Sequence, residues 1–154
     1  MKVAKVSIIA AAVLAVATLA NAQNKPDFSG TWVPDPATEA GGGGGGMGAV
    51  KQTVKQTADT LSVERIVGEN KVSLTYKLDG SETKNQVMAG RGSNTVEAIS
   101  TAKWEGATLV MSMKRPGPDG AIQEAIEKWS LAGDTLTIER TGPGAGKRTF
   151  KKGT

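Results

Sequence analysis

The chain contains no cysteine and no histidine among its 154 residues. Without cysteine it forms no disulfide, offers no thiolate nucleophile and carries no cysteine for a lipid anchor. Without histidine it lacks the commonest transition-metal ligand and the commonest acid–base group near neutral pH. These absences exclude Cys/His zinc sites and every catalytic arrangement that depends on an imidazole. A single domain of this size can still bury a sufficient core without disulfides.

Aromatic residues and excess charge are also scarce. The sequence has two Phe, one Tyr and three Trp, and its net charge is +4. Two of the 19 basic residues, Lys2 and Lys5, precede the expected mature chain, which leaves 17 basic against 15 acidic side chains. Nucleic-acid binding requires a dense basic face, and for single strands stacking aromatics, so it is not expected.

The first 22 residues have the pattern of a secretory signal peptide. Lys2 and Lys5 form a short basic start, and the apolar run from Ile8 to Ala20 is too short to span a bilayer comfortably. Ala20-Asn21-Ala22 is an A-x-A cleavage signal. We therefore expect cleavage after Ala22 and a secreted or periplasmic protein in which 23–154 form one domain; an uncleaved N-terminal anchor is the alternative.

The remaining sequence is a series of short alternating segments separated by turns. Its most regular unit is the stretch 103–109, KWEGATL, which reads as strand, tight turn and strand, and a looser copy follows at 128–136. Between 71 and 78, apolar residues alternate strictly with Lys, Ser and Thr, as on a strand with one buried face. Asp79-Gly80 is a strong hairpin turn.

About ten such segments, with turn signals every 8–12 residues, predict an all-β fold. Because the connections are short, we expect an antiparallel up-and-down (meander) barrel of about 8–10 strands, with an open meander or sandwich as the alternative. The segment 121–131 fits either a helical stripe or a strand face, and we interpret it as a strand. The first strand is expected over 27–33, ended by Pro34 and Pro36. The six glycines from Gly41 to Gly46 predict a loop over 37–48 that is either a mobile lid or a plain surface connection.

The strand that begins Phe28-Ser29-Gly30-Thr31-Trp32, together with hairpins of the form Trp-x-Gly-x-Thr-Leu, resembles the lipocalin-like proteins of the calycin group. It is most similar to small secreted bacterial proteins of that type, and the resemblance covers Asp27 to Lys152. It implies that Trp32 packs across the closed end of a barrel near an arginine, for which Arg140 and Arg148 are both candidates. A Thr-Asp-Tyr loop, a C-terminal helix and a disulfide are missing from the pattern. Gly30, Trp32, Trp104 and Trp129 are the expected structural residues.

Three arginines each lie on the apolar face of an alternating segment. Arg65, Arg115 and Arg140 each extend the apolar face of an alternating run, on the third, seventh and ninth expected strands. Odd strands of a meander run in the same direction, so these side chains are expected to gather at one rim and point inward. Guanidinium groups there suit a carboxylate or phosphate head group, whereas pairing with Glu64, Glu124, Glu127 or Glu139 would merely plug the rim. Tyr76, Met111 and Met113 would line the lumen below or simply fill it.

Enzymatic signals are weak. Carboxylate pairs such as Glu124 with Glu127, or Glu97 with Glu105, have no spacing that selects a glycosidase site. No Asp-x-Asp-x-Asp-Gly calcium loop is present, and no cofactor or metal is expected.

The sequence therefore favours a non-catalytic binding barrel. We expect it to carry a small hydrophobic or anionic amphiphilic ligand, without nucleic acid and without an integral membrane segment in the mature chain. The alternative is an interaction or inhibitor module whose barrel is filled by its own side chains.

Overall fold

The computed structural model describes residues 24–39, 50–89 and 94–153. These ranges contain ten strands and one short helix: β1 (Gly30–Pro34), α1 (Pro36–Glu39), β2 (Gln52–Gln56), β3 (Thr60–Val67), β4 (Asn70–Lys77), β5 (Thr83–Met88), β6 (Thr95–Glu105), β7 (Thr108–Pro116), β8 (Ile122–Ala132), β9 (Thr135–Thr141) and β10 (Gly146–Lys152). No helix within these ranges is long and apolar enough to cross a membrane.

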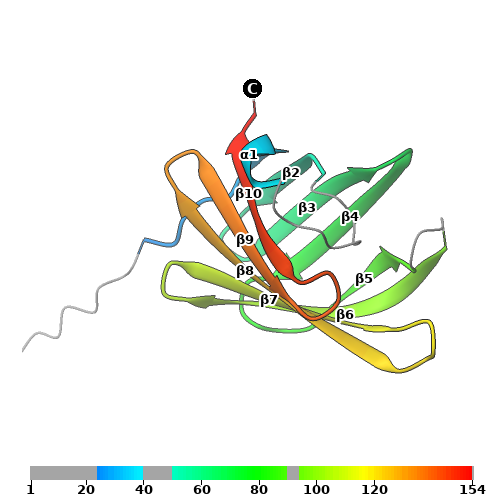
Figure 1. Cartoon of the computed structure of the whole chain (residues 1–154). Coiled ribbons are helices and arrows are strands. Elements are labelled where there is room, and N and C mark those ends of the chain that lie inside the picture. Colours follow the sequence, from blue (N-terminus) through cyan, green and yellow to red (C-terminus); the bar gives the residue numbers. More distant parts are fainter. Residues whose placement is uncertain (1–23, 40–49, 90–93, 154) are drawn as a thin grey trace, which may run out of the picture.

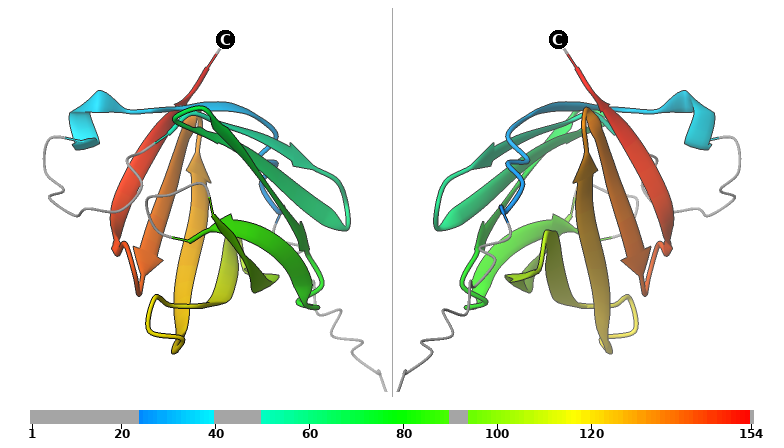
Figure 2. Two further views of the ribbon diagram at one scale, coloured as in Figure 1. Left: turned by 90° about the vertical axis from the view of Figure 1, so that its right-hand side faces the viewer. Right: turned by 90° about the vertical axis from the view of Figure 1, so that its left-hand side faces the viewer.

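All ten strands form one antiparallel sheet in the order β4-β3-β2-β1-β10-β9-β8-β7-β6-β5. The sheet curves round on itself, as the two side views show (Figures 1 and 2). β4 and β5, the two edge strands, come to lie next to each other but share no backbone ladder. The predicted up-and-down barrel is confirmed, as a nearly closed one.

The alternation of the sequence explains which side chains enter the barrel. On β4, Leu74 and Tyr76 are buried, whereas Lys71, Ser73 and Thr75 are exposed. The tight turns need glycine because they place it in the left-handed region, with φ of 63° at Gly106 and 58° at Gly133. Each hairpin therefore keeps its apolar face on one side, and all these faces meet in a single core.

The prediction of a strand over 121–131 is confirmed, because β8 covers Ile122–Ala132. The first strand begins later than expected, at Gly30 rather than Asp27, and α1 after it was not predicted. Asp27 instead accepts the backbone N–H of Ser29 (2.9 Å), which turns the chain before β1 begins. The signal peptide and the Gly41–Gly46 run lie outside the described residues.

One end of the barrel, called here the closed end, is filled by an aromatic group. Phe28, just before β1, is fully buried; it stacks on Trp104 at 5.8 Å between ring centroids and meets Trp129 edge-on at 5.7 Å. Trp32 is also buried, and its indole Nε1 donates to the carbonyl of Phe28 (2.8 Å). The four rings attach the segment just before β1 to β6 and β8.

The cation recorded over Trp32 is Lys152 of β10, at 5.9 Å from the ring centroid. Arg140, one of the two arginines expected there, binds elsewhere, to Glu127. Gly30 accommodates this lysine, because a Cβ at position 30 would approach Cε of Lys152 to 3.1 Å. The glycine of the Gly-x-Trp motif thus leaves room for the lysine stem that covers the tryptophan.

Candidate functional site

Glu127 places a carboxylate inside the barrel. On β8 it alternates in phase with Ala125 and Trp129, both buried, so its side chain points inward. Only 13% of its side chain is exposed. An ionised carboxylate with so little solvent needs cationic or hydrogen-bonding partners to remain charged.

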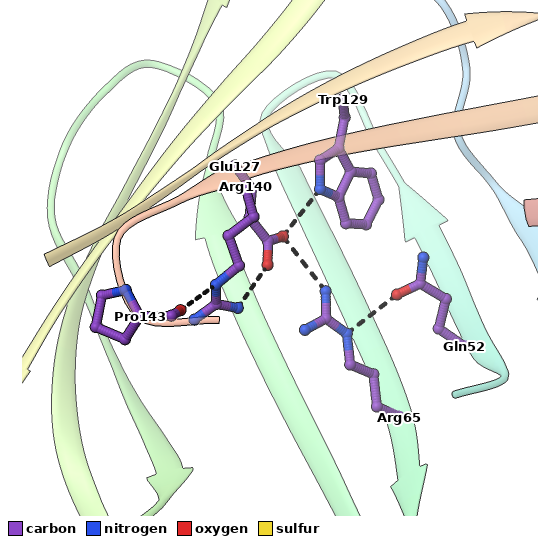
Figure 3. Close-up of polar contacts among 6 residues, drawn as sticks. All are labelled: Gln52, Arg65, Glu127, Trp129, Arg140 and Pro143. Atoms are coloured by element: carbon purple, nitrogen blue, oxygen red, sulfur yellow. Dashed lines mark hydrogen bonds and ion pairs between the residues drawn. The ribbon is translucent and has the colours of Figure 1, made fainter. Parts of the chain in front are cut away.

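Two arginines supply those partners (Figure 3). Nη1 of Arg140 lies 2.9 Å from Oε1 of Glu127, and Nη2 of Arg65 lies 3.5 Å from Oε2. The indole Nε1 of Trp129 donates to Oε2 at 3.0 Å. Each guanidinium side chain is only 16% exposed, so these are largely desolvated ion pairs. We refer to Arg65, Glu127 and Arg140 as the arginine–glutamate cluster.

The pair between Arg65 and Glu127 crosses the inside of the barrel. Arg140 comes from β9, directly opposite Glu127 in the β8–β9 register. Arg65 comes from β3, and either way round the sheet four strands separate β3 from β8. Its guanidinium therefore reaches the carboxylate from the opposite wall. The cluster links two sides of the barrel that no backbone ladder connects directly.

Each arginine of the cluster makes one further hydrogen bond, and Gln52, the partner of Arg65, carries a buried donor that has no partner of its own. Nε of Arg65 donates to Oε1 of Gln52 (3.0 Å), and Nε of Arg140 donates to the carbonyl of Pro143 (2.9 Å). Gln52 is only 2% exposed, and its Nε2 has no hydrogen-bond partner. The cluster thus holds two positive charges, one negative charge and a spare buried amide donor, a combination that favours one further anion or acceptor.

The surroundings act in opposite directions on the acidity of the two inward-facing acids. Burial alone would raise the pKa of Glu127, but Arg65 and Arg140 outweigh it and, with the Trp129 hydrogen bond, hold that pKa below its usual range. Burial raises the pKa of the Tyr76 phenol, and the nearby Glu127 carboxylate raises it further. At neutral pH the ionised Glu127 carboxylate of the cluster therefore lies near the un-ionised phenol of Tyr76.

The lowered pKa of Glu127 predicts a loss of stability in acid. The unfolded chain binds a proton near the ordinary value of 4.5, whereas the folded chain binds it only at lower pH. Glu127 thus contributes fully above the unfolded pKa, and its contribution is lost as the pH falls through the folded pKa. Urea midpoints measured from pH 7 to pH 3 should fall more steeply for the parent than for Glu127→Gln. Equal slopes would contradict the assignment, since Asp27 and Asp79, whose pKa values are also lowered, are present in both proteins.

A small pocket adjoins the cluster. Its volume of about 10 Å³ is enough for roughly one water molecule. It is lined by Tyr76, Met111, Ser112, Met113, Ala125, Glu127 and Arg140. Four of the six predicted binding residues therefore meet around or beside Glu127, and Arg65 joins them as a direct partner of Glu127. A larger occupant would require side chains to move, and the unbranched Met111 and Met113 are well suited to that.

Arg115 is the sixth predicted binding residue and lies apart from the others. Like Arg65 and Arg140, it is near the end of an odd strand, so all three arginines lie toward the same end of the barrel, as the strand count predicted. Its Nη1, however, donates to the carbonyl of Met88 at the end of β5 (2.6 Å). The structure therefore brings two arginines together and uses the third to hold β5.

Sequence reasoning missed Gln52 and underrated Glu127. Both positions carried a signal, because each interrupts an inward-facing apolar phase with a polar side chain: Gln52 between Val50 and Val54, and Glu127 between Ala125 and Trp129. In the part of the chain that the structure describes, no group of three His, Cys, Asp or Glu side chains is placed to hold a metal ion.

No protein-family model matches the sequence, and no curated protein does. Solved structures do match the fold. Secretory abundant heat soluble protein 4 from Ramazzottius varieornatus has a TM-score of 0.58 at 20% identity, covering 86% of this chain and 98% of that one. Human cRBP IV has a TM-score of 0.56 at 18% identity, covering 83% and 99%. The REP1-NXSQ fatty acid transporter has a TM-score of 0.56 at 12% identity, covering 82% and 96%. The chain is therefore similar in fold to calycin-type β-barrels.

Proposed function

We propose that this chain is a non-catalytic binding protein that holds a small hydrophobic or anionic amphiphilic ligand inside the barrel. The observation that carries the proposal is the convergence of Arg65 and Arg140 on a single interior carboxylate. Two guanidiniums against one carboxylate leave an excess positive charge in a largely desolvated position, where an anionic head group interacts strongly. Nε2 of Gln52 offers a further donor.

The apolar part of the ligand would contact Tyr76, Met111 and Met113, which line the pocket beside the cluster. Ligand sites of this kind combine an apolar lining with a few polar groups that fix orientation. The similarity in fold to a fatty acid transporter supports the same class of ligand. The predicted signal peptide supports a site of action in the periplasm or outside the cell.

Direct binding of a fluorescent fatty-acid analogue tests this function. We expect saturable binding of dansyl-undecanoic acid to the mature protein and a loss of about tenfold or more in affinity for Arg65→Ala and for Arg140→Ala, since each removes a charge-assisted contact. Lys128→Ala is the matched control, because it removes one positive charge from an exposed position of β8. Equal affinities in all four proteins would contradict the proposal.

A second candidate follows from the small size of the pocket. A barrel with room for about one water molecule beside its central cluster is also what an interaction or inhibitor module with a filled interior would have. Such a module would present an outer surface to a protein partner, and the exposed Ile66 and Ile122 are apolar residues available for that purpose. It would bind no amphiphile, so the binding assay with dansyl-undecanoic acid separates the two functions.

A further inference from the structure

Among the ten described strands, the ring of backbone ladders is interrupted once, at the seam between β4 and β5. Every other pair of neighbouring strands is joined by an antiparallel backbone ladder. β4 and β5 are consecutive in the chain and joined through residues 78–82, yet they diverge away from that connection (Figure 1). The seam is therefore the place where the wall can widen without breaking a ladder.

The side chain of Asn85 makes hydrogen bonds across the seam. Oδ1 of Asn85, on β5, accepts the backbone N–H of Thr75 on β4 (2.8 Å), and its Nδ2 donates to the carbonyl of the same Thr75 (3.0 Å). The carboxamide thus reproduces the paired contacts that a backbone residue makes in an antiparallel ladder. Asn85 is 6% exposed, so both groups are satisfied in a buried position. Between the described residues of β4 and β5, these are the two hydrogen bonds present.

Among the described residues, side chains lie across the barrel interior both at the closed end and toward the opposite end. At the closed end, Phe28 packs between Trp104 and Trp129. Toward the other end, the ion pair of Arg65 with Glu127 crosses from one wall to the opposite one. Displacing the aromatic group would cost much of the core, and breaking the ion pair would leave charges buried without partners. Breaking the two hydrogen bonds of Asn85 removes neither a charge pair nor an aromatic side chain from the core.

The wall beside the seam carries two hydroxyl groups that have no partner. Thr83 of β5 and Ser100 of β6 lie directly opposite each other in the ladder, and Ser100 is fully buried. Neither Oγ1 of Thr83 nor Oγ of Ser100 has a hydrogen-bond partner. Both hydroxyls can donate to a carboxylate that moves from the surface toward the arginine–glutamate cluster.

We propose that the seam between β4 and β5 is the portal through which the ligand reaches the interior, with Asn85 as the clasp that holds it. The inference rests on the proposed function. It names the residues of the portal, Thr75, Thr83, Asn85 and Ser100, none of which belongs to the predicted binding set. A portal governs how fast a ligand enters and leaves, whereas the cluster governs how tightly it is held.

Cross-linking the folded protein across the seam tests the portal. Ser73→Cys with Gln86→Cys places two exposed thiols on either side of it, and the native chain has no cysteine to interfere. The matched control is Ser130→Cys with Thr137→Cys, which are paired across the ordinary β8–β9 ladder, away from the seam. Both proteins are joined with the same short cleavable bifunctional thiol reagent, and uptake of dansyl-undecanoic acid is followed by stopped-flow fluorescence.

We expect the seam cross-link to slow uptake by about tenfold or more, with an equilibrium affinity within about twofold of the parent, and cleavage of the linker to restore the rate. The control cross-link should leave uptake unchanged.

In the uncross-linked protein, Asn85→Ala should speed release, whereas the exposed neighbour variant Gln86→Ala should not. Normal binding with unchanged uptake in the cross-linked protein would overturn the portal alone. The absence of any saturable binding by the parent would overturn the proposed function and the portal with it.

Discussion

Replacing Glu127 with Gln is expected to destabilise the barrel by about 3–5 kcal/mol, the usual cost of removing one partner from a buried ion pair. The substitution preserves shape and retains an acceptor for the Trp129 indole, but it leaves Arg65 and Arg140 without a counter-charge at side chains that are 16% exposed. Urea unfolding followed by tryptophan fluorescence measures the change.

Glu139→Gln on the neighbouring strand is the matched control. Glu139 pairs with Lys147 at 3.3 Å, but both side chains are more than half exposed, so its loss should cost less than about 1 kcal/mol. We also expect dansyl-undecanoic acid to raise the unfolding midpoint of Glu127→Gln more than that of the parent, because the probe's carboxylate can replace the missing charge. Similar costs for the two Glu→Gln variants would contradict the central role assigned to Glu127.

Phe28→Ala is expected to cost about 3–5 kcal/mol, the range for truncating a fully buried aromatic side chain. Phe28 has no exposed surface, stacks on Trp104 and meets Trp129 edge-on. It precedes β1, so its loss also weakens the attachment of the segment just before β1 to the closed end. Thermal unfolding and urea titration of the mature protein measure the effect.

Val33→Ala provides the comparison for Phe28→Ala. Val33 lies on β1 with 40% of its surface exposed, so its truncation should cost about 1 kcal/mol or less. A cost for Phe28→Ala that is no larger than this would mean that the segment before β1 does not seal the barrel.

The fold could be predicted from the sequence because the patterns that specify its strands and turns each lie within a short stretch of the chain. Period-two alternation on β4 and the glycine turns at Gly106 and Gly133 fix strand faces and hairpins within a few residues of one another. The same alternation placed Arg65, Arg115 and Arg140 at one end, since it needs only the strand count and the direction of odd strands.

The sequence offered four glutamates as possible partners of those arginines, but it could not select Glu127, which binds both Arg65 and Arg140. Arg65 and Glu127 are 62 positions apart and meet only because the sheet curves until β3 faces β8. The seam is a similar case, because Asn85 finds Thr75 where two edge strands meet in space. What the sequence did contain was a polar side chain within an inward-facing phase, at Gln52, Asn85 and Glu127. At such interruptions of a buried face this barrel makes its buried hydrogen bonds and ion pairs.

The carboxylate of Glu127 sets the net charge of the arginine–glutamate cluster. Glu127 already occupies part of the site that two arginines offer, so the net interior charge of the three groups is one positive rather than two. A single monoanionic head group balances that charge, and a dianionic one exceeds it. We therefore expect the site to prefer carboxylates over doubly charged phosphates.

Mapping where an amphiphile binds by NMR tests the central claim most directly. Backbone amide shifts of the isotope-labelled mature protein are followed during titration with dansyl-undecanoic acid. Binding inside the barrel predicts saturable shifts centred on Tyr76, Met111, Met113, Glu127 and Arg140, with those of outward-facing positions such as Lys128 and Glu139 much smaller. Shifts confined to the outer faces, or none at saturating probe, would contradict an interior binding site and favour the interaction module.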